Sequence, residues 1–208
     1  MIRELAIWTS GLVRREDGST AAEFGLLAAF FISFMLAIID AGRLAWTLNV
    51  DKAATRAAAR MAIVRPMISG WMGSDFSWTV AGDPQSDGNG QTAPSDDVPM
   101  QTCGSDGAGG VQCGPNDCTQ NACDATTFQA ITALMRKYDA SIQDNNVEIV
   151  YQHVGLGVIG NPNNHDVEPL VTVRLRNMTF QTGALRLFGV ESVVLPAMSS
   201  TLVGEHQP

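Results

Sequence analysis

The sequence predicts an α+β protein in which one long N-terminal helix spans a membrane and forms a spine, followed by a small antiparallel sheet and one further helix. Three observations lead to this fold class. Residues 24–39 form a run of 16 without a charged side chain. Short segments of the C-terminal half alternate apolar and polar residues, as half-buried strands do. Between residues 126 and 138, apolar residues recur at helical spacing.

The apolar run is expected to cross the membrane as part of a longer helix. Sixteen residues rise about 24 Å, less than the ~30 Å hydrocarbon core of a bilayer. Counted from Ala21 to Trp46, the helix is long enough if Asp40 and Arg43 pair or extend towards the interface. The alternative is a buried core helix of a soluble protein. The four phenylalanines and the lack of a polar stripe from 24 to 39 argue against it.

Beyond the membrane the helix is expected to continue. Residues 53–60 are rich in alanine, the best helix former. Arg65-Pro66 should end the helix, because proline restricts the residue before it. One helix from Ser19 to Val64 follows, with an outer half that forms the spine of a small domain. Its basic residues step by four and form one stripe facing solvent or a partner: Lys52, Arg56 and Arg60.

Residues 66–208 are expected to form the α+β domain outside the membrane. A helix is predicted over Thr126–Tyr138, capped by Asp124 or Thr126. Strands are predicted at 147–154, 170–175, 191–195 and 199–203, the last two pairing with each other, and a short strand at Trp78–Val80. The connection from Asn177 to Phe188 is polar, with apolar anchors at Phe180, Leu185, Leu187 and Phe188.

Residues 81–125 are predicted to be a loop held by cysteines, because glycine, aspartate, proline, serine and asparagine dominate much of the segment. All the cysteines lie here: Cys103, Cys113, Cys118 and Cys123. Their gaps of nine, four and four residues do not match the paired two-residue spacing of zinc sites. Two disulfides are therefore favoured, which indicates an oxidising compartment. Of the three possible connectivities we favour Cys103–Cys113 with Cys118–Cys123.

Charge and motifs exclude several function classes. Residues 1–65 carry eight Lys/Arg and six Asp/Glu, whereas residues 66–208 carry five and fifteen. Because residues 66–208 are strongly acidic, they have no electrostatic basis for binding nucleic acid. No nucleophile–base pair, phosphate loop or metal-ligand spacing stands out. We therefore predict no enzyme, no catalytic residue, no cofactor and no metal.

The N-terminal motif points to a family. Gly18-Ser-Thr-Ala-Ala-Glu23-Phe24 resembles the processing motif of type IV pilins and pseudopilins. With Ile38-Ile-Asp-Ala-Gly-Arg43 and the alanine-rich stretch after Asn49, residues 14–65 resemble the TadE-like minor pseudopilins of tight-adherence (Tad, Flp) pilus systems. The resemblance covers the C-terminal part only loosely. It implies a pilin-like fold of helix spine and sheet.

The resemblance also implies a processing and assembly site. A prepilin peptidase would cut after Gly18, which makes residues 1–18 a leader and leaves Ser19 as the new N-terminus. Glu23, followed by Phe24, would then pair with that amine, its own or that of a neighbouring subunit. Small residues suited to close helix contact follow: Gly25, Ala28, Ala29 and Ser33. A plain alternative remains, because Thr20 and Glu23 also fit a capping box that needs no processing.

The resulting hypothesis is a structural minor pseudopilin of a Tad pilus system. Its expected partners are the inner membrane, other pilin or pseudopilin subunits, the prepilin peptidase and the Tad secretion machinery. We expect a single-pass protein of the bacterial inner membrane with a periplasmic C-terminal domain, which can also be incorporated into an extracellular pilus. The count of basic residues favours the opposite orientation, so the cysteines and the resemblance carry this choice. The alternative function is an uncleaved, membrane-tethered binding module of an envelope complex.

Overall fold

The computed structural model describes residues 19–68, 92, 100–105, 107, 111–114, 123–158 and 167–204. The leader and the expected strand Trp78–Val80 lie outside these residues. The chain divides into two compact units. One contains the helix up to Leu44 together with Gln181–Val193. The other contains Ala45–Phe180 and the chain from Val194 onwards.

Helix α2, Ser19–Val64, is one continuous helix of 46 residues, as the sequence predicts. Its last turn closes with a hydrogen bond of 3.2 Å from the amide of Arg65 to the carbonyl of Met61. Pro66 has no amide hydrogen and restricts Arg65, so the helix stops at Val64.

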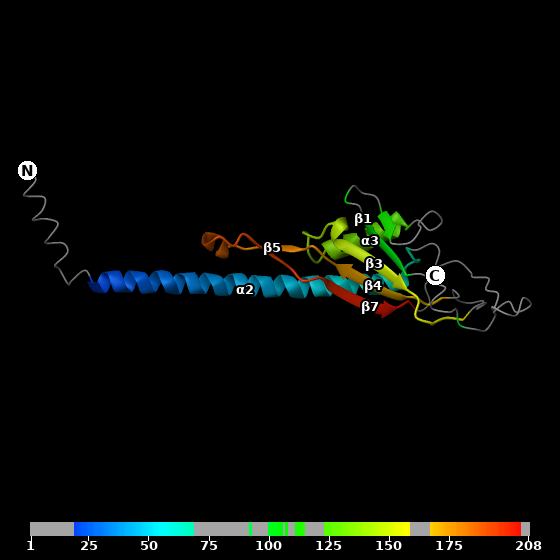
Figure 1. Ribbon diagram of the computed structural model, residues 1–208, viewed down its shortest axis with the longest axis horizontal. Helices are drawn as coiled ribbons and strands as arrows, with labels where there is room; N and C mark the ends of the chain where they lie inside the picture. Colours follow the sequence, from blue (N-terminus) through cyan, green and yellow to red (C-terminus); the bar gives the residue numbers. More distant parts are fainter. Residues whose placement is uncertain are drawn as a thin grey trace, which may run out of the picture. The chain divides into compact units, whose positions relative to one another are not determined.

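A five-stranded antiparallel sheet has the order β2-β1-β3-β4-β7, and Figure 1 labels β1, β3, β4 and β7. Its strands are β1 (Gln101–Ser105), β2 (Val111–Gly114), β3 (Val147–Gln152), β4 (Leu170–Leu175) and β7 (Met198–Val203). In the register of the central pair, Ile149 lies opposite Val173 and Tyr151 opposite Val171. These four side chains are fully buried. The alternation in the sequence therefore does mark the inner face of the sheet.

Helix α3, Ala125–Arg136, supplies the other part of this core. Asp124 caps it by accepting hydrogen bonds from the amides of Thr126 and Thr127. Hydrogen bonds from Thr127 and Thr126 hold the pKa of the Asp124 carboxyl below its usual value. The apolar stripe of the helix is buried through Phe128, Ile131 and Met135.

Residue Ile68 connects three elements of the sheet unit. Its amide donates a hydrogen bond to the hydroxyl oxygen of Tyr151 in β3 at 3.3 Å. Its carbonyl accepts the amide of Asp124, the cap of α3, at 2.8 Å. The chain leaving α2 is thus bonded to both the sheet and the second helix. Burial raises the pKa of Tyr151 to about 12, so its hydroxyl stays neutral.

The loop prediction for residues 81–125 is wrong where the structure describes it, because β1 and β2 lie there. Their composition gives no alternating pattern; pairing of Cys103 with Ile149 in β3 supplies the missing partner. The favoured disulfides are also wrong. Cys103 is bonded to Cys123, with 6.0 Å between the Cα atoms, which joins β1 to the start of α3.

The C-terminal strands pair differently from the prediction. β7 pairs with β4, and Thr172 and Thr201 bring their hydroxyls to 2.9 Å. β6 (Ser192–Val194) instead pairs with β5 (Thr179–Gln181) in a separate two-stranded sheet. Short 3₁₀ helices η2 (Asp144–Asn146) and η3 (Leu185–Phe188) complete the described elements.

Candidate functional site

The N-terminal half of α2 presents apolar side chains on its exposed surface. Among the described residues, α2 is the one helix that is long and apolar enough to cross a membrane. The most apolar stretch of α2 is not buried by any other part of the fold. Phe24 and Phe30 are each 73% exposed. A soluble core helix would bury this surface, so the alternative interpretation finds no support in the fold.

The predicted assembly residues lie at the beginning of this half. Ser19 is the first residue of α2 and Glu23 lies one turn further, with an exposed side chain. A carboxylate in this position interacts favourably with the partial positive charge at a helix N-terminus. The arrangement therefore suits Glu23 to a role at the start of the helix.

The predicted contact residues lie on neighbouring turns of the same helix. Gly25, Ala29 and Ser33 are spaced by four and share one face. A side chain added at Gly25 would meet no atom within 4 Å. Ser33 donates its hydroxyl to the carbonyl of Ala29 at 2.8 Å, so its polar atom needs no partner from outside the helix. This face is open for another helix.

Where the apolar run ends, a second cluster forms around Asp40, which is only 2% exposed. Its Oδ1 accepts the amide of Gly183 at 3.2 Å, and its Oδ2 accepts the amides of Ala184 and Leu185 at 2.8 Å each. Arg43 lies 3.3 Å from Oδ1, so the predicted pair is confirmed. We call this set of five residues the Asp40 clamp.

The Asp40 clamp leaves little room for a side chain at position 183. A Cβ atom there would lie 2.8 Å from Nη1 of Arg43 and 3.0 Å from Oδ1 of Asp40. No sequence pattern revealed this partner, because more than 140 positions separate Asp40 from Gly183 along the chain. An isolated aspartate beside an apolar run was the available signal, since such a carboxylate normally has a dedicated partner.

The outer half of α2 carries a different buried carboxylate. Asp51 is fully buried beside Ala54, Thr55 and Ala58, which form one face of the helix. No donor among the described residues reaches either of its oxygens. Burial raises the pKa of Asp51 to about 7, and the nearby Asp139 carboxyl adds to the increase. Two ionised carboxylates have no proton to share, whereas a protonated Asp51 can donate to Asp139.

The basic stripe of the outer half is exposed along its length, at Lys52, Arg56 and Arg60. The predicted stripe therefore lies on the exposed side of the helix and not against the core of its own unit. Its residues lie on a regular helix rather than in a free loop, in the same unit as the sheet. The stripe is available for solvent or for a partner.

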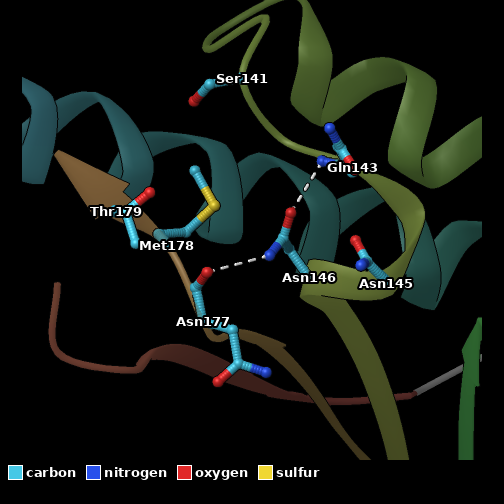
Figure 2. Close-up of a pocket in the computed structure, with 7 residues that line it drawn as sticks. All are labelled: Ser141, Gln143, Asn145, Asn146, Asn177, Met178 and Thr179. Carbon is cyan, nitrogen blue, oxygen red and sulfur yellow. Dashed lines mark hydrogen bonds between the residues drawn. The ribbon is translucent and has the colours of Figure 1, made fainter. Parts of the chain in front are cut away.

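A hollow beside η2 is lined by uncharged side chains (Figure 2). The side chain of Asn146 occupies it, accepting from the amide of Gln143 and donating to the carbonyls of Arg176 and Asn177. Asn177 has a left-handed backbone, with φ of 57°. Amides, hydroxyls and one methionine line this hollow, and none of these lining residues is a base that could activate a hydroxyl.

Residues 18–60 match the TadE-like protein family (TadE). The similarity is confined to this N-terminal part of the chain. The match begins at Gly18, includes Glu23 and Asp40, and ends in the alanine-rich outer half of α2. The family is a structural component of Tad pili rather than an enzyme family, and the match covers residues 18–60 of the 208-residue chain. No curated protein and no solved structure matches the chain.

Proposed function

We propose that the protein is a minor pseudopilin of a Tad (Flp) pilus system, trimmed after Gly18 and assembled through helix α2. The observation that carries the proposal is a coincidence of boundaries. The TadE-like match begins at Gly18 and the helix begins at Ser19. A cut between these residues removes the leader and leaves the helix whole.

Trimming gives Glu23 a specific partner. A new α-amino group at Ser19 would lie one turn before the carboxylate. A charged group at the edge of a membrane helix is costly unless it is paired. Pairing of the amine with the carboxylate would remove this cost for both groups. Pairing between subunits would fix how far one helix slides along the next.

Helix contact would supply the remaining association energy. In lipid, helices associate through close packing of small residues rather than through the hydrophobic effect. The exposed face of Gly25, Ala29 and Ser33 permits such an approach, and Ala28 and Phe24 flank it. Other pilin or pseudopilin subunits are therefore the partners that this face fits.

The disulfide supports a periplasmic C-terminal part. Cys103–Cys123 joins β1 to the start of α3, and disulfides persist in oxidising compartments. The N-terminus would then lie on the cytoplasmic side of the inner membrane, where a prepilin peptidase reaches it. The exposed Lys52, Arg56 and Arg60 do not oppose this orientation strongly, because they belong to a folded domain.

Trimming is tested by the mass of the full-length protein purified from membranes with a co-expressed prepilin peptidase. We expect the mass of residues 19–208. Gly18→Val should retain the leader, because a bulky side chain blocks the cut. Gly11→Val, a matched change within the leader, should be trimmed normally. An intact Met1 in the unchanged protein, with an active peptidase, would refute the proposal.

Assembly is tested separately with Glu23→Gln, which keeps the shape and removes the charge. Under the proposal, the trimmed variant stays in the membrane but no longer enters sheared pilus fractions. Glu168→Gln, a carboxylate of the sheet unit, serves as the control. Unaffected incorporation of Glu23→Gln would favour the other candidate, an uncleaved membrane-tethered module.

A further inference from the structure

Residues 181–193, which we call the arm, expose apolar side chains near their tip. Leu187 is 79% exposed, Phe188 61% and Val190 41%. The sequence led us to expect Leu187 and Phe188 as apolar anchors of this connection, and the fold buries neither of them. Three exposed apolar residues within four positions are an unusual surface for a segment in water.

The arm is fixed to the membrane half of α2. The Asp40 clamp holds its backbone at Gly183, Ala184 and Leu185, directly after the apolar run of the helix. The arm and the helix up to Leu44 form one compact unit. Figure 1 shows the segment that follows β5 lying beside the middle of α2, where the Asp40 clamp holds it. The exposed tip is therefore a neighbour of the surface that lipid would cover.

The backbone of the arm is suited to an environment without water. Its turn is closed by hydrogen bonds from Leu187 to Ala184, from Gly189 to Arg186 and from Val190 to Leu185. The left-handed conformation of Gly189, with φ of 85°, ends η3.

Further bonds join the two sides of the arm. The amide of Thr182 donates to the carbonyl of Glu191 at 3.2 Å, and its hydroxyl donates to the carbonyls of Val190 and Glu191. Peptide groups at membrane depth need such internal partners, because lipid supplies none.

The short apolar run of α2 explains why Asp40 needs the arm. The run from Phe24 to Ile39 rises about 24 Å, several ångströms less than a hydrocarbon core. Asp40 therefore falls within or at the edge of the apolar layer, where an unsatisfied carboxylate is expensive. Three amides and Arg43 satisfy its oxygens. The apolar layer can then extend past Asp40 towards Trp46.

We propose that the tip of the arm, Leu187, Phe188 and Val190, inserts into the acyl chains of the leaflet that faces the C-terminal part of the protein. Its occupant is lipid rather than a second subunit, because the tip continues the lipid-facing surface of the same helix. The exposed Arg186 beside the tip can reach lipid phosphates while its stem stays in the apolar layer. The inference rests on α2 spanning a membrane, and not on trimming or pilus assembly.

The test is photo-crosslinking of the full-length protein in vesicles of phosphatidylethanolamine and phosphatidylglycerol. A benzophenone-bearing phenylalanine analogue replaces one aromatic residue at a time. Phe188 tests the arm, and Phe30 reports on the helix. Tyr138, an exposed aromatic residue of the sheet unit, is the matched control. We expect lipid adducts at Phe30 and Phe188 in comparable yield. At Tyr138 we expect no lipid adducts above background.

The outcomes separate the inference from its basis. Lipid adducts at Phe30 without adducts at Phe188 would overturn the insertion of the arm while leaving the spanning helix intact. Adducts from Phe188 to a second copy of the chain would also overturn it, because the occupant would then be a subunit. Absence of lipid adducts at Phe30 would show that α2 does not span the membrane, which removes the inference as well. Trimming and assembly are unaffected by the first two results.

Discussion

Helix α2 carries one buried carboxylate in each half, and the two halves treat it in opposite ways. In the apolar N-terminal half, Asp40 is surrounded by donors: three amides and Arg43. In the outer half, Asp51 has no donor within reach among the residues that the structure describes, and it faces another carboxyl, Asp139. Both are on the same helix and both are shielded from water.

The contrast shows two ways of removing the cost of burying an acid. Asp40 keeps its charge because hydrogen bonds replace the water that it lost. Burial favours the protonated form of Asp51, so its environment is more stable while that proton is bound. The first solution fixes a distant segment to the helix. The second makes the packing of the outer half depend on pH.

The largest expected effect is on the Asp40 side of this comparison. Asp40→Ala removes the acceptor of three amides, each in a bond to a charged group. We expect the arm to lose about 3 kcal/mol or more of local stability, which corresponds to amide exchange at Gly183–Leu185 faster by about 100-fold. Hydrogen exchange of the full-length protein in detergent micelles measures it.

Asp51→Asn is the matched control, because it alters the other buried carboxylate of the same helix and should leave exchange in the arm unchanged. Exchange at Gly183–Leu185 that stays slow in Asp40→Ala would mean that the clamp does not hold the arm.

The second prediction concerns the pH dependence of Asp51. Its pKa is 3.8 in an unfolded chain and about 7 in the fold. Between these values the folded state binds more protons than the unfolded state, so stability falls as pH rises, and the loss is complete above about pH 7. Asp51→Asn should therefore stabilise the protein by about 1–3 kcal/mol at pH 8, because the amide can donate to Asp139.

Thermal unfolding at pH 4 to 8 measures this effect, and the variant should show a flatter profile than the unchanged protein. Glu168→Gln controls for the loss of one negative charge. Parallel profiles for Asp51→Asn and the unchanged protein would show that Asp51 is not the titrating group.

The smallest expected effect sharpens what holds Asp40. Gly183→Ala places a Cβ against the guanidinium of Arg43, which can move because it ends a flexible side chain. The hydrogen bonds from the backbone amides to Asp40 should survive, while the ion pair between Arg43 and Asp40 is lost. Because Arg43 is 55% exposed, we expect a loss of only about 1 kcal/mol in the arm.

Gly25→Ala is the glycine control, since an added Cβ there meets nothing within 4 Å. Hydrogen exchange at residues 181–193 distinguishes the two. A loss in Gly183→Ala as large as that of Asp40→Ala would show that the approach of backbone to carboxylate, and not the ion pair alone, depends on this glycine.

Local patterns predicted the elements that depend on local forces. The uncharged run, the alanine-rich stretch and Pro66 defined α2, because helix formation and termination depend on neighbouring residues. The apolar spacing of Phe128, Ile131 and Met135 defined α3. Asp40 and Arg43 were paired correctly because three positions separate them on one helix.

Non-local contacts explain the errors. β1 has a sequence typical of a loop, and it becomes a strand because β3 and the bond from Cys103 to Cys123 hold it. β7 pairs with β4 rather than with β6. Leu187 and Phe188 are apolar, yet composition could not show that the fold leaves them exposed. In each case the partner lies far along the chain.

The sequence by itself determined a long helix with an apolar first half, a glycine before it and a lone acid at its beginning, since these properties are carried by adjacent residues. Only the tertiary structure decided what becomes of the two buried aspartates. The environment of a carboxylate is set by whichever segments fold against it, and for Asp40 that segment is the arm. Hydrogen bonding across such a separation leaves no pattern in the sequence, because a backbone amide is the same in every residue that has one.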